Sequence, residues 1–213
     1  MVAFTRTKLA EAKFFLDRLP ETADNSDIFY YQISAFLTAW RSTLDIMLYD
    51  FADRYPLRFT REDDISRRDF KIAARAINNS EALRFIDWWE SKQSILGSTP
   101  LWKKRNINLH RGSIPLVRTY TILASGSGGT SGTVSLYSSN VIKLENNHLF
   151  VTPIFVPNKV VVPVAASKTA TSSTQEWHFD DIPDENAIDI CKQAYNKMEE
   201  IVKEAEASFG VNL

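Results

Sequence analysis

Residues 27–54, DIFYYQISAFLTAWRSTLDIMLYDFADR, carry an apolar residue at every third or fourth position along their whole length. This spacing places the apolar side chains on one face and predicts a long helix with a buried stripe. Ser26 and Asp27 supply a cap at its start, and Pro56 follows its end. The stripe consists of Phe29, Ile33, Phe36, Trp40, Leu44, Met47 and Phe51. A helical bundle is the simplest architecture that covers it.

Further helical patterns lie on both sides of this stretch. The first predicted helix, residues 5–19, ends before Pro20 because a proline interrupts the helical hydrogen bonds. The other predicted helices cover residues 66–78, 80–97, 100–114 and 183–209. Their apolar stripes include Phe70, Ile72, Ala73, Ile77, Leu83, Ile86, Trp89, Ile95 and Cys191.

The segment between the last two helices has a different character, with few charges and many β-branched residues. These patterns predict strands at residues 116–124, 133–137, 149–156, 160–165 and 174–179. A loop at 125–132 and a turn at 145–148 are expected between them. We therefore predict a mainly α fold, with residues 1–115 and 183–213 forming an antiparallel helical bundle. Residues 116–182 form a β-rich insertion of the same domain.

Composition describes an ordinary globular chain of 213 residues, with 25 basic and 26 acidic side chains. A net charge of −1 offers no general attraction for nucleic acid, so any polyanion site must be a local basic patch. Cys191 is the only cysteine, which excludes an intrachain disulfide. No apolar run has the length of a signal segment or a spanning helix. These features predict a cytoplasmic protein that does not enter a membrane.

Residues 105–110, RNINLH, place an arginine, an amide and a histidine within one and a half turns of the helix predicted for residues 100–114. Thr99 and Pro100 suit the start of that helix. On a helical projection Asn106 and His110 share one face between apolar ridges, and Lys104 falls on the solvent side. Polar groups between apolar ridges are expected to be buried or covered by a partner, and they need hydrogen bonds there.

These residue types suit the cleavage of a phosphodiester. Histidine exchanges a proton near neutral pH, and an asparagine four residues earlier can orient it. Arg105 carries a permanent charge that would stabilise the charge developing on phosphorus. One histidine supplies only one proton-transfer group, so a two-fold dimer that brings two such helices together would supply both acid and base.

The motif resembles the signature of the HEPN superfamily, in which an arginine followed by a polar residue precedes a histidine by four to six residues. The long helix over 27–54, the later motif helix and the closing helix are similar to the HEPN arrangement, whereas residues 116–180 are not accounted for by it. The resemblance implies a metal-independent RNA endonuclease whose site forms at a homodimer interface. It assigns catalysis to Arg105 and His110 and an orienting or binding role to Asn106. Many such proteins are toxins or defence effectors, and some members are inactive.

Other charged residues have both a structural and a functional interpretation. Lys103, Lys104 and Arg111 could form a rim that binds the RNA phosphates, or a solvated helix face. Arg41 and Asp45 have the spacing of an ion pair on one helix face. Either residue could also face the site and contact the catalytic side chains.

The remaining histidines, His148 and His178, lack metal-ligand spacing. Neither a metal nor another cofactor is therefore expected.

The leading hypothesis is an HEPN-type ribonuclease, acting as a homodimer on RNA, with an antitoxin or regulatory protein as a further partner. The alternative is a catalytically inactive HEPN-like module that binds a nucleotide or a protein; Asn106 and His110 would then be a hydrogen-bonded core pair. In a third interpretation, the low-charge sheet carries a protein-interaction function and the helices serve as its scaffold.

Overall fold

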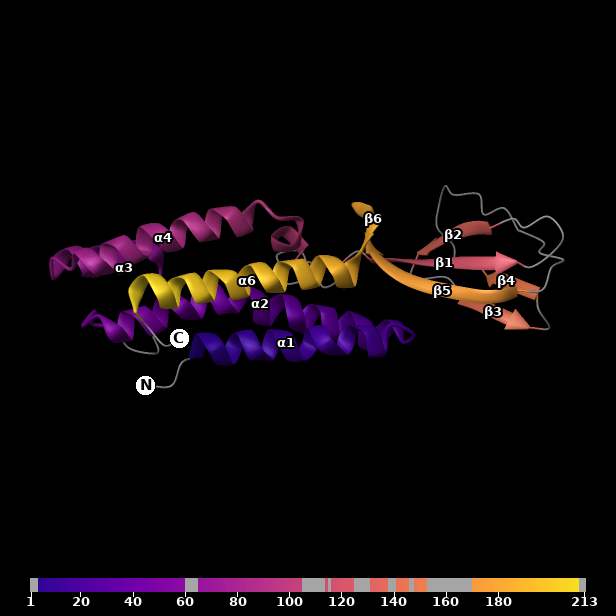
Figure 1. Cartoon of the computed structure of the whole chain (residues 1–213), viewed down its shortest axis with the longest axis horizontal. Coiled ribbons are helices and arrows are strands. Elements are labelled where there is room, and N and C mark those ends of the chain that lie inside the picture. Colours follow the sequence, from indigo (N-terminus) through magenta and orange to yellow (C-terminus); the bar gives the residue numbers. More distant parts are fainter. Residues whose placement is uncertain are drawn as a thin grey trace. The chain divides into compact units, whose positions relative to one another are not determined.

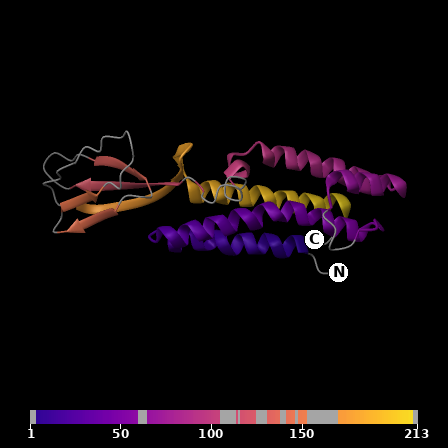
Figure 2. The same cartoon turned by 180° about the vertical axis from the view of Figure 1, so that it is seen from behind.

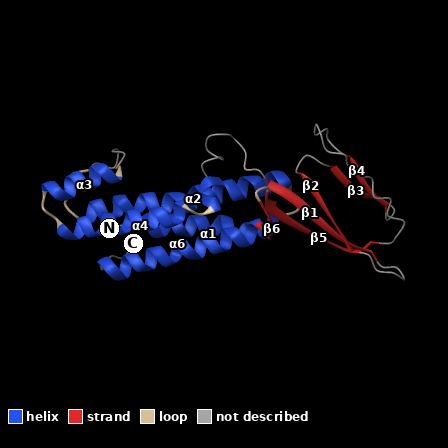
Figure 3. Cartoon of the chain, turned by 90° about the horizontal axis from the view of Figure 1, so that it is seen from above, coloured by secondary structure: helices blue, strands red, loops and turns tan. Residues whose placement is uncertain are grey.

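The chain is mainly helical, with a small antiparallel sheet before the last helix (Figures 1 and 3). The computed structural model describes residues 4–59, 65–104, 114, 116–124, 131–137, 141–145, 148–152 and 170–210. Two compact units can be distinguished. One holds the helices, and the other is made of Ala23–Ser26 and Pro115–Asp189.

Five long or medium helices are described in the helical unit, and all of them were expected from the sequence. Their bounds are α1 (Phe4–Thr22), α2 (Ser26–Arg54), α3 (Arg67–Ala76), α4 (Ser80–Gly97) and α6 (Ala187–Phe209). The predicted stripe of α2 is confirmed, because each of its seven members is fully buried. None of the helices within the described residues has an apolar stretch long enough to cross a lipid bilayer.

Hydrogen bonds between distant residues define the direction of each helix in the bundle (Figures 1 and 2). Near the start of α1, Thr5 donates its backbone N–H to Asp50 near the end of α2, at 2.8 Å. The indole of Trp40 in α2 donates to the Ala194 carbonyl of α6, at 2.9 Å. The indole of Trp89 in α4 donates to the Leu44 carbonyl of α2, at 2.8 Å.

Contacts at the other end of α6 complete this arrangement. Arg84 at the start of α4 donates to the Ser208 carbonyl near the end of α6, at 3.3 Å. Lys92, two turns later in α4, pairs with Glu204 at 2.8 Å. Successive long helices therefore alternate in direction, so that α1 and α4 run antiparallel to α2 and α6.

Aromatic side chains close the end of the bundle where α2, α4 and α6 meet. The rings of Phe51 and Phe85 stack with their centroids 3.6 Å apart. Phe209 packs edge-on against both, at 5.5 Å from each centroid. Phe70 of α3 contacts Phe85 at 5.6 Å. This cluster joins four helices through side chains that are widely separated in the sequence.

Helix α1 continues past Pro20, where the sequence predicted its end. The proline lies in the last turn, so the helix loses only one backbone hydrogen bond. The Thr22 hydroxyl donates to the Arg18 and Leu19 carbonyls at 3.1 and 3.3 Å, which satisfies acceptors at this end.

Three isoleucines assigned to buried stripes are exposed instead. Ile72, Ile77 and Ile95 retain 53%, 44% and 45% of their accessible surface. In α3 only Phe70 and Ala74 are buried, so Ile72 lies on the exposed side of that helix. Ile77 follows the end of α3, and Ile95 lies in α4.

The sheet has the strand order β2-β1-β5-β6, and every pairing is antiparallel. A separate hairpin joins β3 to β4, with Glu145 paired to His148 as the predicted turn requires. The strands are β1 (Leu116–Ala124), β2 (Ser131–Tyr137), β3 (Val141–Glu145), β4 (His148–Thr152), β5 (Ala170–Phe179) and β6 (Ile182–Asn186).

The sequence prediction missed two of these strands. Strand β3 was left unassigned, and β6 occupies residues where the last helix was expected to begin. That helix begins instead at Ala187, where Asn186 Oδ1 accepts the Ile188 N–H at 2.9 Å. The strand expected at 160–165 lies outside the described residues.

Replacing Phe85 with alanine should lower the free energy of unfolding by about 3–5 kcal/mol, because it removes a buried ring and leaves a cavity beside Phe51. Urea denaturation followed by circular dichroism measures this change. Tyr31, which is 76% exposed, is the control position, and Tyr31→Ala should change the stability by less than about 0.5 kcal/mol. Equal effects of the two variants would contradict a central role for the aromatic cluster.

Candidate functional site

The catalytic residues expected from the sequence, Arg105, Asn106 and His110, lie outside the described residues, as does Arg111. The structure describes the helical segment 100–104 that leads into them. This segment follows α4 after a short break, where the Thr99 hydroxyl donates to the Leu96 carbonyl at 2.6 Å. Thr99, predicted to cap the motif helix, thus bonds to the end of the preceding one.

A cluster of four side chains connects this segment to α2. The Arg41 guanidinium lies 3.8 Å from the centroid of the Trp102 ring. The same guanidinium donates to Asp45 one turn later, at 2.5 Å. Trp102 also packs edge-on against Trp40, with centroids 6.0 Å apart. The predicted Arg41–Asp45 pair therefore exists, and its arginine contacts a residue three positions before Arg105.

These contacts hold the Arg41 side chain in one orientation. The Arg41 side chain is only 13% exposed, so its charge acts in a less screened environment than a surface charge. A guanidinium stacked on an aromatic face while bonded to a carboxylate has little rotational freedom. The cluster holds the helical segment 100–104 against α2.

The two lysines before the motif have different environments. Lys103 is exposed, as a phosphate-binding rim requires. Lys104 is only 2% exposed, so the prediction that it faces solvent is wrong. Leu101, which is 1% exposed, lies three residues earlier and shares the buried face. The helical projection assigned Trp102 to an apolar ridge and did not consider Leu101. Had Leu101 been included, Lys104 would have been predicted on a buried face.

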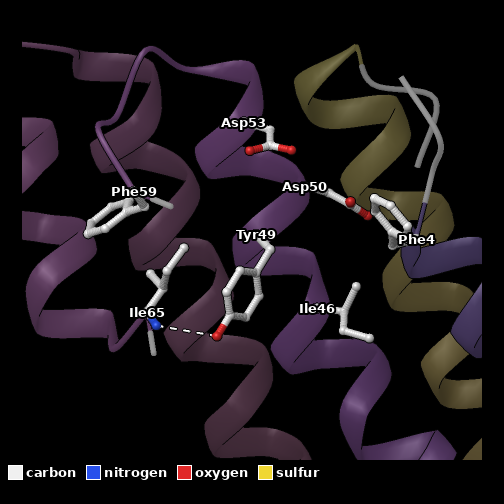
Figure 4. Close-up of a pocket in the computed structure, with 7 residues that line it drawn as sticks. All are labelled: Phe4, Ile46, Tyr49, Asp50, Asp53, Phe59 and Ile65. Atoms are coloured by element: carbon white, nitrogen blue, oxygen red, sulfur yellow. Dashed lines mark hydrogen bonds between the residues drawn. The ribbon is translucent and has the colours of Figure 1, made fainter. Parts of the chain in front are cut away.

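A pocket of about 250 Å³ opens elsewhere in the helical unit, and the sequence did not indicate it (Figure 4). The Asp50 side chain in its wall is buried and accepts from the Thr5 N–H and hydroxyl, at 2.8 and 2.5 Å. Tyr49 accepts the Ile65 N–H at 3.4 Å. The lining residues are Phe4, Ile46, Tyr49, Asp50, Asp53, Phe59 and Ile65. Asp50 therefore satisfies the first turn of α1 and is a structural carboxylate.

His178 of β5, in the second unit, is buried. Its Nδ1 lies 2.9 Å from the Glu185 carbonyl, and its Nε2 lies 3.6 Å from the Glu176 carboxylate. Among the residues that the structure describes, no group of three His, Cys, Asp or Glu side chains could hold a metal ion. Cys191 is fully buried as predicted, and burial raises the pKa of its thiol, which disfavours the reactive thiolate.

Comparison with protein-family models, curated proteins and solved structures finds no match to this chain. A function must therefore be inferred from the chain's own residues and contacts.

Replacing Arg41 with methionine should lower the free energy of unfolding by about 1–2 kcal/mol, because the variant loses both the ring contact and the ion pair. Lys13→Met is the matched control, since Lys13 pairs with Asp17 at the same i,i+4 spacing on an exposed face. The control should cost less than about 0.5 kcal/mol. Urea denaturation of both variants measures the difference, and equal losses would show that Trp102 adds nothing.

Replacing Asp50 with alanine should cost about 1–3 kcal/mol, because it leaves the Thr5 N–H and hydroxyl without their acceptor. Asn keeps one carbonyl oxygen at this position, so Asp50→Asn should retain more stability than Asp50→Ala. Thermal unfolding of the two variants checks the order. The reverse order would contradict the capping role of this side chain.

Proposed function

We propose that this protein is a metal-independent RNA endonuclease of the HEPN type, active as a homodimer. The observation that carries the proposal is the position of the Arg105-Asn106-x3-His110 motif. It directly follows a helical segment whose Trp102 contacts Arg41 of the central helix. The alternating directions of α1, α2, α4 and α6 are compatible with the HEPN-like bundle that the motif suggests.

The chemistry is a transesterification within the RNA strand. The 2′-oxygen attacks phosphorus, the bond from phosphorus to the 5′-oxygen breaks, and a cyclic phosphate and a 5′-hydroxyl result. His110 would take the proton from the 2′-hydroxyl or give one to the leaving oxygen. Arg105 would stabilise the added charge on the phosphate oxygens, and Asn106 would orient the imidazole.

The burial of residues 101–104 bears on which face could carry this chemistry. If the helix continues to residue 114, as the sequence predicts, Asn106 and His110 fall within about 60° of the exposed Lys103. The buried Leu101 and Lys104 mark a different face. On that basis Asn106 and His110 would be available to a second copy and to RNA, rather than forming a pair inside one bundle.

Arg105 falls about 140° from His110 on the same projection. A guanidinium and an imidazole so far apart on one helix converge poorly on one phosphate. A two-fold dimer would place one copy's histidine beside the other copy's motif and supply two proton-transfer groups. Lys103 and Arg111 would then contribute to phosphate binding at the edges.

Replacing His110 with alanine should reduce RNA cleavage in EDTA by about 10²–10⁴-fold, the usual contribution of a positioned acid or base. A fluorescently labelled oligoribonucleotide measures the rate, and light scattering measures the dimer. His148→Ala is the control, because His148 is not part of the motif. Arg105→Ala should reduce the rate as strongly as His110→Ala.

Equal cleavage by the wild type and His110→Ala would disprove the assignment. Absence of cleavage by the wild type, with retained binding of RNA, a nucleotide or a protein, would support the alternative of an inactive HEPN-like binding module. A role as toxin or defence effector predicts in addition that expression arrests growth and that His110→Ala relieves the arrest.

A further inference from the structure

Helix α3 presents a basic face that has no part in the packing of the bundle. Arg67, Arg68 and Arg75 are all exposed. Arg68, Ile72 and Arg75 lie within about 60° of one another around the helix, so two arginines flank one exposed isoleucine. The opposite face carries Phe70 and Ala74, which are fully buried.

The exposed cations of the described residues include some with an ion pair and some without one, and Arg58, Arg84 and Lys103 belong to the second group, as the α3 arginines do. In the described part of the chain, none of the three α3 arginines forms an ion pair. By contrast, Lys13, Lys197 and Lys203 each pair with a carboxylate three or four residues away. Lys71, on the edge of α3, pairs with Asp87 and Glu90 of α4, and these carboxylates raise the pKa of its ammonium. The three arginines themselves therefore have no ion-pair partner among the described residues, whereas Lys71, which lies between Arg67 and Arg75 on the helix surface, is paired.

The position of Arg67 and Arg68 in the helix strengthens this observation. They occupy the first turn, where the helix dipole is positive and disfavours further positive charge. Helix stability therefore gives no reason for two arginines there. An anionic ligand would gain from both the guanidinium groups and the helix end.

We propose that the exposed side of α3 that carries Arg68 and Arg75, together with Arg67 in the first turn, binds the phosphate backbone of single-stranded RNA. The substrate class follows from the proposed ribonuclease function, on which this inference rests. Guanidinium groups match phosphate oxygens in a bidentate manner. Arg68 and Arg75 are about 10 Å apart along the helix axis, which suits a polyanion whose charges repeat along a chain. A lipid surface would require a broad apolar face, and Ile72 alone does not provide one.

The location of this face makes it an anchoring site rather than part of the cleavage site. Helix α4 separates α3 from the helical segment 100–104 that precedes the motif. Lys71 of α3 pairs with Glu90 of α4, which is ten residues, or about 15 Å along a helix, before residue 100. The α3 arginines would therefore hold the strand away from the scissile bond, and their loss should raise KM while leaving kcat almost unchanged.

The test is a triple variant, Arg67→Gln, Arg68→Gln and Arg75→Gln, because glutamine keeps the helix propensity and removes the charge. A matched control replaces the paired Lys13, Lys197 and Lys203 with glutamine and changes the net charge by the same amount. A second control replaces the three arginines with lysine. Circular dichroism and thermal unfolding confirm that each variant folds like the wild type.

Binding of a fluorescent oligoribonucleotide is measured by anisotropy at several salt concentrations, in the His110→Ala background so that cleavage does not interfere. The arginine-to-glutamine variant should bind RNA at least about tenfold more weakly. The slope of log K against log salt should decrease in magnitude by about 2, because each lost phosphate contact removes about 0.7. The lysine-to-glutamine control should keep the wild-type slope. The arginine-to-lysine variant should keep most of it.

Equal loss in both glutamine variants would overturn the proposal, because a general charge effect would then explain the binding. So would arginine-dependent binding of anionic vesicles or polyglutamate in place of RNA. In the wild-type background, a fall in kcat at constant KM would also overturn it. If the arginines are needed for RNA binding but the wild type cleaves no RNA, the proposed ribonuclease function fails and the α3 site stands.

Discussion

The fold depends on the burial of one face of α2, and two tryptophans fix the helices that cover it. Trp40 of α2 and Trp89 of α4 are both buried, and each indole N–H donates to a main-chain carbonyl of a neighbouring helix. A buried indole without an acceptor would be costly, so these bonds restrict how α4 and α6 can slide along α2. Apolar burial brings the helices together, and the two directional bonds select their register.

Local patterns were sufficient to predict the helices and part of the sheet, although not the register of the helices. The stripe of α2 has a strong helical period, and β1 was predicted with the bounds that the structure shows, because β-branched and apolar residues continue to its end. The errors occur where the local residue preferences differ from what the surrounding structure allows or requires. Pro20 was read as a stop although a last-turn proline costs little, and Ile182–Asn186 resembles a helix start although it pairs with β5.

The candidate site shows what a sequence projection can and cannot supply. Arg41 and Asp45 could be paired from their spacing alone, but the contact of Arg41 with Trp102 joins segments about sixty residues apart and has no local signal. The burial of Lys104 could have been found from Leu101, three residues before it. The α3 arginines were missed because a charged residue in a helical pattern is normally solvated, and only the structure shows which of those charges lack a counterion.

Helix α3 separates the residues that hold it in place from those available to a ligand. Phe70 packs against Phe85, and Lys71 bonds to Asp87 and Glu90, so one side of the helix carries its attachment to α4. A ten-residue helix is too short to persist in water without such contacts. None of the three arginines takes part in that attachment, although Arg67 and Arg75 each lie one turn from Lys71 on the helix surface. Their charge can therefore be used for binding at no cost to the packing of the bundle.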